Sequence, residues 1–93
     1  MSLLVRKVVL KSQFERDWRK WIAGRPEAAD AQAVMELLAA GAPLDQRQRD
    51  HPLKGDWKGC RDCHVRGDLV VIYSLPPGLV VFHRIGSHSE LFG

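Results

Sequence analysis

The chain has 93 residues, of which 45% are hydrophobic and 27% are charged, so it can build the core of one small domain and is not a disordered chain. No apolar stretch is long enough for a membrane-spanning helix, because two prolines and a glycine interrupt the longest nearly uncharged segment, residues 69–82. The amino terminus lacks the apolar region of a signal peptide, and two cysteines in a chain without an export signal argue against a disulfide scaffold. We therefore expect residues 1–93 to form a single cytoplasmic domain.

The charge is unevenly distributed along the chain. Residues 1–25 carry seven basic and two acidic side chains (+5). Residues 26–46 carry no basic and four acidic side chains (−4). Residues 47–93 carry seven basic and five acidic side chains (+2), together with all four histidines. A basic chain with an acidic middle segment suits a polyanionic partner on one surface and a different partner on another. The alternative is an ordinary solvated surface of mixed charge.

The first half of the chain predicts a strand followed by two helices. Residues 3–10 are rich in β-branched side chains, which is typical of a strand. Ser12 and Glu15 have the spacing of a capping box, and apolar residues then recur on one helical face until a glycine and a proline end the helix. A second helix is predicted over residues 26–40, with Gly41 as its stop. We expect both apolar stripes to pack in the core.

The second half predicts three strands and a short helical turn. The strands follow a polar loop over residues 42–56 and are expected at residues 57–65, 69–73 and 79–84. Ser87 and Glu90 repeat the capping-box spacing near the carboxyl terminus, which predicts one turn of helix there. The expected order is strand, helix, helix, three strands and a turn.

The run Cys60-Arg61-Asp62-Cys63-His64 contains the C-x-x-C-H pattern of c-type haem attachment. Positions three apart on a strand point to opposite faces, so the two thiols would need a bulge to share a haem or a zinc ion. Haem attachment would normally require export as well. We interpret both cysteines as small strand residues, and a zinc or redox protein built on them is the alternative.

Three histidines lie in loops or at the ends of predicted elements, where functional sites are usually built: His51, His64 and His88. Histidine suits acid–base work because its unperturbed pKa of about 6.5 lets it exchange protons near neutral pH. Basic side chains that could hold an anion are close in sequence: Lys54, Lys58, Arg61 and Arg84. His83 lies in the middle of a predicted strand, and we interpret it as a structural or surface residue.

Three motifs carry a resemblance to a known family. They are His51-Pro52-Leu53-Lys54-Gly55-Asp56-Trp57-Lys58-Gly59, then Arg61-Asp62-x-His64-Val65 with Asp68, and Arg84-x-Gly86-Ser87-His88-x-x-Leu91-Phe92. Together they resemble the YafQ family of bacterial toxins, within the RelE-like group of ribosome-dependent messenger-RNA interferases. The resemblance is dense over residues 50–93, and over residues 1–49 only the order of elements agrees.

The resemblance implies an α+β fold of the RelE-like type, in the order β-α-α-β-β-β with a short carboxyl-terminal helical turn. In this fold, a twisted and mostly antiparallel four-stranded sheet has two helices on one face. The implied function is that of a type II toxin, which cleaves messenger RNA in the ribosomal A site until an antitoxin neutralises it. A toxin of related fold that acts by binding alone is the alternative, against which the cluster of titratable residues argues.

By the resemblance, the catalytic residues are His51, His64, Asp68, His88 and Phe92. Cleavage without a metal needs a base for the 2′-OH proton, an acid for the departing 5′-oxygen, and cations that stabilise the phosphoryl charge. Asp68 with His64 or His51 is the candidate base, and His88 is the candidate acid. Phe92 is either a stacking surface for a base or a hydrophobic peg for the terminal turn. The candidate RNA-binding residues are Lys54, Lys58, Arg61 and Arg84.

Three further expectations concern the site. No metal or cofactor is expected, because the predicted elements do not bring together three or four metal ligands. Leu69 stands where the family commonly has tryptophan, which bears on substrate stacking or codon preference. A three-residue loop over residues 65–67, with Gly67 in the left-handed conformation, would place His64 directly opposite Asp68, so that Asp68 could orient His64.

Overall fold

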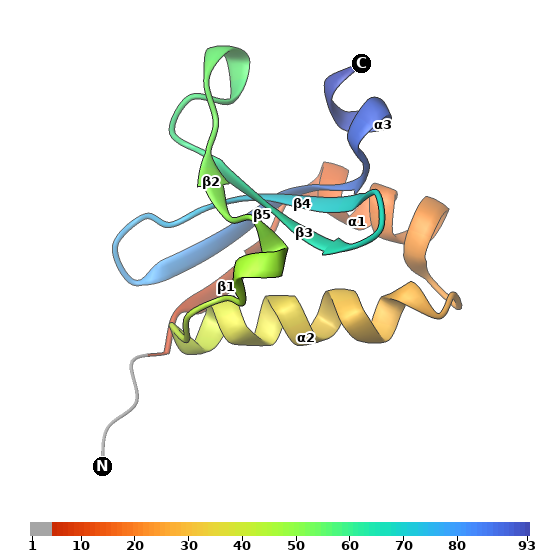
Figure 1. Cartoon of the computed structure of the whole chain (residues 1–93). Coiled ribbons are helices and arrows are strands. Elements are labelled where there is room, and N and C mark those ends of the chain that lie inside the picture. Colours follow the sequence, from red (N-terminus) through yellow and green to blue (C-terminus); the bar gives the residue numbers. More distant parts are fainter. Residues whose placement is uncertain (1–4) are drawn as a thin grey trace.

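The computed structural model describes residues 5–93, which form a twisted five-stranded β-sheet with the long helices on one face (Figure 1). The strands are β1 (Lys7–Leu10), β2 (His51–Pro52), β3 (Arg61–Arg66), β4 (Leu69–Ser74) and β5 (Leu79–Ser87). Their order in the sheet is β1-β5-β4-β3-β2, with β1 parallel to β5 and the other neighbours antiparallel. The expected α+β architecture with a mostly antiparallel sheet is confirmed.

The prediction of a four-stranded sheet is wrong, because the sheet has five strands. The additional strand, β2, lies inside the segment 42–56 that the sequence predicted as a loop. His51 of β2 pairs with Asp62 of β3, and Pro52 pairs with Arg61, at the edge of the sheet. A strand of two residues has no hydrophobic alternation of its own, so the local sequence carries no signal for it.

Strands begin later than predicted at two places. Of the strand predicted over residues 3–10, residues 3 and 4 lie outside the described residues, and within them the strand is Lys7–Leu10, without residues 5 and 6. The strand predicted over residues 57–65 begins only at Arg61, because Gly55–Trp57 forms a 3-10 turn, η3.

The helices are α1 (Ser12–Asp17), α2 (Glu27–Ala40) and α3 (His88–Phe92), with a π-helical turn η1 (Trp18–Ile22) after α1 and a 3-10 turn η2 (Gln46–Gln48) before β2. The prediction that the apolar stripes of the first two helices pack in the core is confirmed, since these side chains are buried against the sheet: Phe14, Ile22, Ala31, Val34 and Leu38. Gly41 ends α2 with a φ of 72°, the left-handed conformation expected of a helix stop. In the part of the chain that the structure describes, no helix has the length and apolarity needed to cross a bilayer.

Of the two predicted capping boxes, one is wrong and one is confirmed. The N-cap of α1 is Lys11, not Ser12, because the Lys11 N–H still donates to the Phe82 carbonyl at 3.0 Å and extends the β1–β5 pairing to the start of the helix. At α3 the box is complete. The Ser87 hydroxyl accepts from the Glu90 amide at 3.2 Å, and the Glu90 carboxylate accepts from the Ser87 amide at 2.8 Å.

The predicted register of the β3–β4 hairpin is wrong. Arg66 pairs with Leu69 across a two-residue turn, and His64 pairs with Val70, so Asp68 is a turn residue and does not lie opposite His64. Between these two pairs β3 has one residue more than β4, and this residue, Val65, forms a β-bulge. The side chain of Val65 packs against the core beneath the sheet. Gly67 does have the expected left-handed conformation, with a φ of 53°.

The sheet has a second, smaller apolar cluster on the face away from α2, which we call the open face. Its buried members are Val70, Ile72 and Leu91, and Leu53, Trp57, Cys60 and Phe92 pack against them. Figure 1 shows that the segment between β2 and β3 and the terminal helix α3 both rise from the sheet on this side, opposite α2. The open face is therefore flanked by the elements that carry most of the candidate site residues.

Candidate active site on the open face

Strand pairing places two of the candidate histidines on the open face. His51 lies opposite Asp62, which lies opposite Ile72. Two residues further along β3, His64 lies opposite Val70. Residues paired directly across antiparallel strands share a face, as do residues two apart on one strand. His51 and His64 are therefore on the same side of the sheet as the Val70–Ile72 cluster.

Asp68 and His88 meet at one end of the sheet. The backbone N–H of His88 donates to the carbonyl of Asp68 at 3.2 Å, which ties the start of α3 to the hairpin turn. Within α3, the ring of His88 lies 4.8 Å from the ring of Phe92, centroid to centroid. Phe92 is half-buried against the open-face cluster, a placement that fits a peg for α3, and its stacking on a base stays a prediction.

The two ring nitrogens of His51 have different surroundings. Nδ1 lies 2.6 Å from the carbonyl oxygen of Arg49 and 3.3 Å from Oδ1 of Asp62. A carbonyl oxygen can only accept a hydrogen bond, so Nδ1 carries the proton and donates it. Among residues 5–93 no group hydrogen-bonds to Nε2, and half of the side chain is exposed. In the neutral ring, Nε2 is therefore the free acceptor.

The segment that carries His51 is anchored from the other side of the sheet. The carboxylate of Asp50 accepts hydrogen bonds from the buried hydroxyl of Tyr73 and from Arg61, whose Nε and Nη2 lie at 3.0 and 3.3 Å. Burial, with Asp50 beside it, raises the pKa of Tyr73 above its ordinary value, so the hydroxyl stays a donor. Arg61, a candidate RNA-binding residue, is thus bound to Asp50, and its contact with RNA stays a prediction.

Arg84 is also engaged within the protein. Its Nε and Nη2 donate to the Asp17 carboxylate of α1 at 2.7 and 3.1 Å, and the Ile85 amide donates to the same carboxylate at 3.1 Å. Asp17 is only 3% exposed. This ion pair joins α1 to β5, and the expected role of Arg84 in holding RNA stays a prediction.

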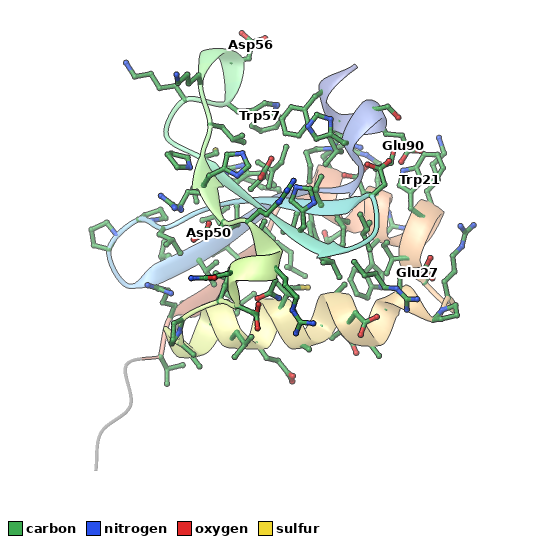
Figure 2. All side chains as sticks on the ribbon, in the orientation of Figure 1. Trp21, Glu27, Asp50, Asp56, Trp57 and Glu90 are labelled. Carbon is green, nitrogen blue, oxygen red and sulfur yellow. The ribbon has the colours of Figure 1, made fainter. Side chains whose placement is uncertain are left out.

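The two candidate lysines are free of such contacts in the described chain. Lys54 and Lys58 are exposed and flank the turn η3. Figure 2 shows Asp56 at the tip of this turn, pointing away from the sheet, and Trp57 on its inner side. Trp57 packs against the open-face cluster and thereby fixes the position of the loop and of both lysines.

His64 also lines a groove of about 880 Å³ between α2, residues 43–49 and the β3–β4 hairpin. Three arginines that the sequence did not single out line the same groove: Arg47, Arg49 and Arg66. The signal available in the sequence was the positive charge of residues 47–93 as a whole. Arg66 is paired there with Asp30 and Arg47 with Asp45, so among residues 5–93 Arg49 is the groove arginine without an ion pair.

His83 has the structural role that the sequence indicated. Its Nε2 lies 2.8 Å from the hydroxyl of Ser74, and its ring meets the edge of Trp57 at 6.2 Å between centroids. Burial lowers the pKa of His83, and the charge of Lys11 lowers it further. The neutral ring is the form that fits these contacts.

We expect a pH dependence of stability from His83. Because its pKa in the folded state is lowered, the unfolded chain takes up the proton more readily, and the free energy of unfolding falls as the pH drops through about 6.5. Urea unfolding at about pH 7.5 and pH 5.5, which bracket that value, measures the fall. The variant His83→Gln should lose less stability between the two pH values than the wild type, and an equal loss in both proteins would contradict this role.

The two cysteines lie on opposite sides of the sheet, as expected. Cys60 packs against the open-face cluster, whereas Cys63 is fully buried in the core beneath the helices. Burial, with the nearby acidic residues, raises the pKa of the Cys63 thiol to about 12, so the thiol stays protonated and unreactive. Across residues 5–93 no three His, Cys, Asp or Glu side chains are placed so that they could hold a metal ion.

Sequence reasoning missed the acidic residues that hold the site together: Asp17, Asp50 and Asp62. Asp62 had a usable signal, because it lies two residues before His64 on a predicted strand and so shares its face. Asp17 and Asp50 had none, since their partners Arg84 and Tyr73 are distant in the sequence.

Known proteins are similar to this chain in sequence and in fold. A family model described as "Bacterial toxin of type II toxin-antitoxin system, YafQ" matches residues 6–93. The chain belongs to the YafQ family. It is 35% identical over 92 residues to the mRNA interferase toxin YafQ of Escherichia coli (strain K12), covering 98% of this chain and 100% of that protein. It is 39% identical over 91 residues to the putative toxin YafQ of Haemophilus influenzae, covering 90% and 89%.

Solved structures of the family agree with the architecture described above. The crystal structure of YafQ from E. coli strain BL21(DE3) matches with a TM-score of 0.87 at 35% identity, covering 95% of this chain and 99% of that one. A crystal structure of the E. coli DinJ–YafQ complex matches with a TM-score of 0.85 at 36% identity, with the same coverage. The RelE-like fold expected from the resemblance is confirmed, and the chain is a toxin of a type II toxin–antitoxin system.

Proposed function

We propose that this YafQ-family toxin is an endoribonuclease that cleaves messenger RNA in the ribosomal A site and thereby stops translation. The observation that carries the proposal is the placement of His51 and His64 on one face of the sheet, with Asp68 and His88 joined at its end. A toxin that acted by binding alone would not need titratable side chains there. The name of the E. coli relative, an mRNA interferase, supports the same activity.

The base in the proposed reaction is His51, through its free Nε2. Nε2 takes the proton of the ribose 2′-OH while Nδ1 keeps its hydrogen bond to the Arg49 carbonyl. The 2′-oxygen then attacks the neighbouring phosphorus, forming a P–O bond as the bond to the 5′-oxygen breaks. His88 donates a proton to the departing 5′-oxygen, which leaves a 2′,3′-cyclic phosphate and a 5′-hydroxyl.

The charge that develops on the phosphoryl oxygens needs nearby donors and cations. His64 lies on the same face as His51, beside the groove that carries three arginines. Lys54 and Lys58 stand exposed on the loop at the other side of the face and bind the phosphates of the flanking nucleotides. The backbone carbonyl of Asp68 holds the start of α3 and thereby helps to place His88. The step as proposed uses no metal ion.

The proposed partners are the ribosome, its messenger RNA and a cognate antitoxin. The E. coli relative has been crystallised with DinJ as a toxin–antitoxin complex. The positive charge of residues 1–25 and 47–93 suits an acidic segment that folds as it binds. Because ribosomes are the target, we propose that residues 1–93 act as one toxin domain in the cytoplasm.

The function is tested with purified toxin that has been stripped of metal and added to translating ribosomes programmed with a defined messenger RNA. We expect cleavage within the A-site codon, mapped by primer extension, and growth arrest on expression that a co-expressed cognate antitoxin relieves. Inhibited translation with intact messenger RNA would instead indicate a toxin that only binds. Stoichiometric zinc in the protein, with activity lost on its removal, would overturn the metal-free step.

A further inference from the structure

We propose that Asp62 is a positioning residue for His51. Its buried carboxylate and the backbone carbonyl of Arg49 together hold the imidazole with the proton on Nδ1 and with Nε2 turned toward the RNA. The inference rests on the proposed function, in which His51 is the base. It adds a residue that touches neither RNA nor the reacting atoms.

The burial of Asp62 requires an explanation. The residue is 2% exposed, and its Oδ1 is the buried side-chain atom that lacks a well-formed hydrogen bond among residues 5–93. A carboxylate removed from water costs free energy unless it is paired and hydrogen-bonded. The partner within ion-pair distance is Nδ1 of His51, at 3.3 Å. A buried acid that faces a candidate catalytic histidine is better explained by the site than by stability.

The geometry places Nδ1 between two acceptors. The carbonyl of Arg49 lies at 2.6 Å and Oδ1 of Asp62 at 3.3 Å, so the carbonyl is the first acceptor for the Nδ1 proton and the carboxylate is the second. When Nε2 takes the proton of the 2′-OH, the ring becomes a cation beside the carboxylate. Asp62 then stabilises the positive charge that the proton transfer creates on the imidazole. Because Asp62 and the Arg49 carbonyl keep the proton on Nδ1, Nε2 is the one ring nitrogen that is free to accept the 2′-OH proton.

The backbone around β2 is built to maintain this contact. Direct pairing of His51 with Asp62 puts the two side chains on one face of the sheet. Arg49 has a φ of 50°, an uncommon left-handed conformation for a residue with a side chain, and its carbonyl meets the ring. Asp50 is anchored beneath the sheet by Tyr73. Three successive residues therefore fix the orientation of the imidazole.

Other charged groups near this contact have partners of their own or lie further along the face. His64 lies two residues along β3 from Asp62. Arg84 is beyond Ile72 in the same row of the sheet, and its guanidinium is held by Asp17. Asp62 is thus the acid that the structure assigns to His51.

The first readout is spectroscopic and needs no RNA. Long-range ¹H–¹⁵N spectra of the free wild-type toxin should show His51 with a proton on Nδ1 and a free Nε2. In the isosteric variant Asp62→Asn, the amide can donate to Nδ1, so we expect the fraction of the Nδ1–H form to fall. The matched control is Glu36→Gln, which removes the same charge from the exposed surface of α2 and should leave the His51 signals unchanged.

The second readout is kinetic, on ribosomes. Asp62→Asn should lower kcat at least tenfold with KM within about twofold, as expected when a histidine loses the acid that sets its tautomer, while Glu36→Gln stays at the wild-type values. Wild-type His51 with its proton on Nε2 would overturn the proposal even if Asp62→Asn failed to fold. An unchanged tautomer and kcat in a folded Asp62→Asn variant would overturn it too. If the wild type cleaves no RNA, the proposed function is wrong. The spectra of the free toxin still support or overturn the contact between Asp62 and His51 in that case.

Discussion

Replacing His51 or His88 by alanine is expected to lower the rate of messenger-RNA cleavage by about 10²–10⁴-fold in each case, the usual contribution of a positioned base or acid. His51 is singled out by its free Nε2, since Nδ1 is already committed to the Arg49 carbonyl. His88 is placed by the capped start of α3 and by the ring of Phe92. Single-turnover cleavage on ribosomes at saturating toxin measures the chemical step.

The matched control is another histidine of the same sheet, His83. It hydrogen-bonds to Ser74, away from the proposed proton transfers, so His83→Gln should cleave within about twofold of the wild type. Antitoxin binding and thermal unfolding show whether each variant is folded. Cleavage by His51→Ala at the wild-type rate would remove it as the base, and His64→Ala and Asp68→Asn would then test the remaining candidates.

The double variant His51→Ala/His88→Ala gives a further check on the mechanism. If base and acid act in the same step, losing either disables the same transition state, so the double variant should be only slightly slower than the more damaging single variant. Multiplied effects would indicate that the two histidines contribute independently to the transition state.

Local patterns predicted the elements of this fold well where an element is long or capped. The stripe of α2 and its stop at Gly41 follow from helical periodicity and from the conformational freedom of glycine. The capping box at Ser87 was predicted correctly, although Ser87 also ends β5 opposite Leu69. The prediction from the same spacing at Ser12 is wrong, because the pairing of β1 with β5 continues through the Lys11 N–H. Two identical local signals therefore have different outcomes, and the residue at which the preceding strand stops pairing decides between them.

The candidate site was harder to predict, since it depends on register. The sequence supplied His51, His64 and His88, but their spatial relation follows from a two-residue strand and from a bulge at Val65. A shift of one residue sends a side chain to the other face, and no local pattern here fixes that choice. The spacing of Asp62 from His64 could be read from the sequence, but its contact with His51 follows only from the pairing of β2 with β3.

The ion pair between Asp17 and Arg84 should give the largest effect on stability. The Asp17 carboxylate accepts hydrogen bonds from Arg84, Gln13 and the Ile85 amide, and it joins residues 67 positions apart in the chain. Asp17→Ala leaves a half-buried guanidinium and a buried amide without their acceptor. We expect the free energy of unfolding to fall by about 3 kcal/mol, at the low end for a broken buried pair because Arg84 is 25% exposed. Urea unfolding near neutral pH measures it.

The acid side of the pH profile provides a second measure of the same contact. Burial alone would raise the pKa of Asp17, but the hydrogen bonds from Arg84, Gln13 and the Ile85 amide outweigh it and lower the pKa below 3.8. A carboxyl group whose pKa is lower in the folded state than in the unfolded chain stabilises the fold above pH 3.8. That contribution to the free energy of unfolding is lost as the pH falls below 3.8 toward the pKa of the folded state. Asp17→Ala should therefore lose less stability in acid than the wild type.

Asp30→Ala is the matched control for Asp17→Ala. It removes an exposed ion pair with Arg66, in which the side chains are 50% and 55% exposed, and it should cost less than about 1 kcal/mol. Because β5 ends at Ser87 and His88 follows directly, removing the Asp17 carboxylate should also reduce cleavage by loosening the placement of α3. Equal losses of stability in the two variants would mean that the Asp17–Arg84 pair does not hold α1 to β5.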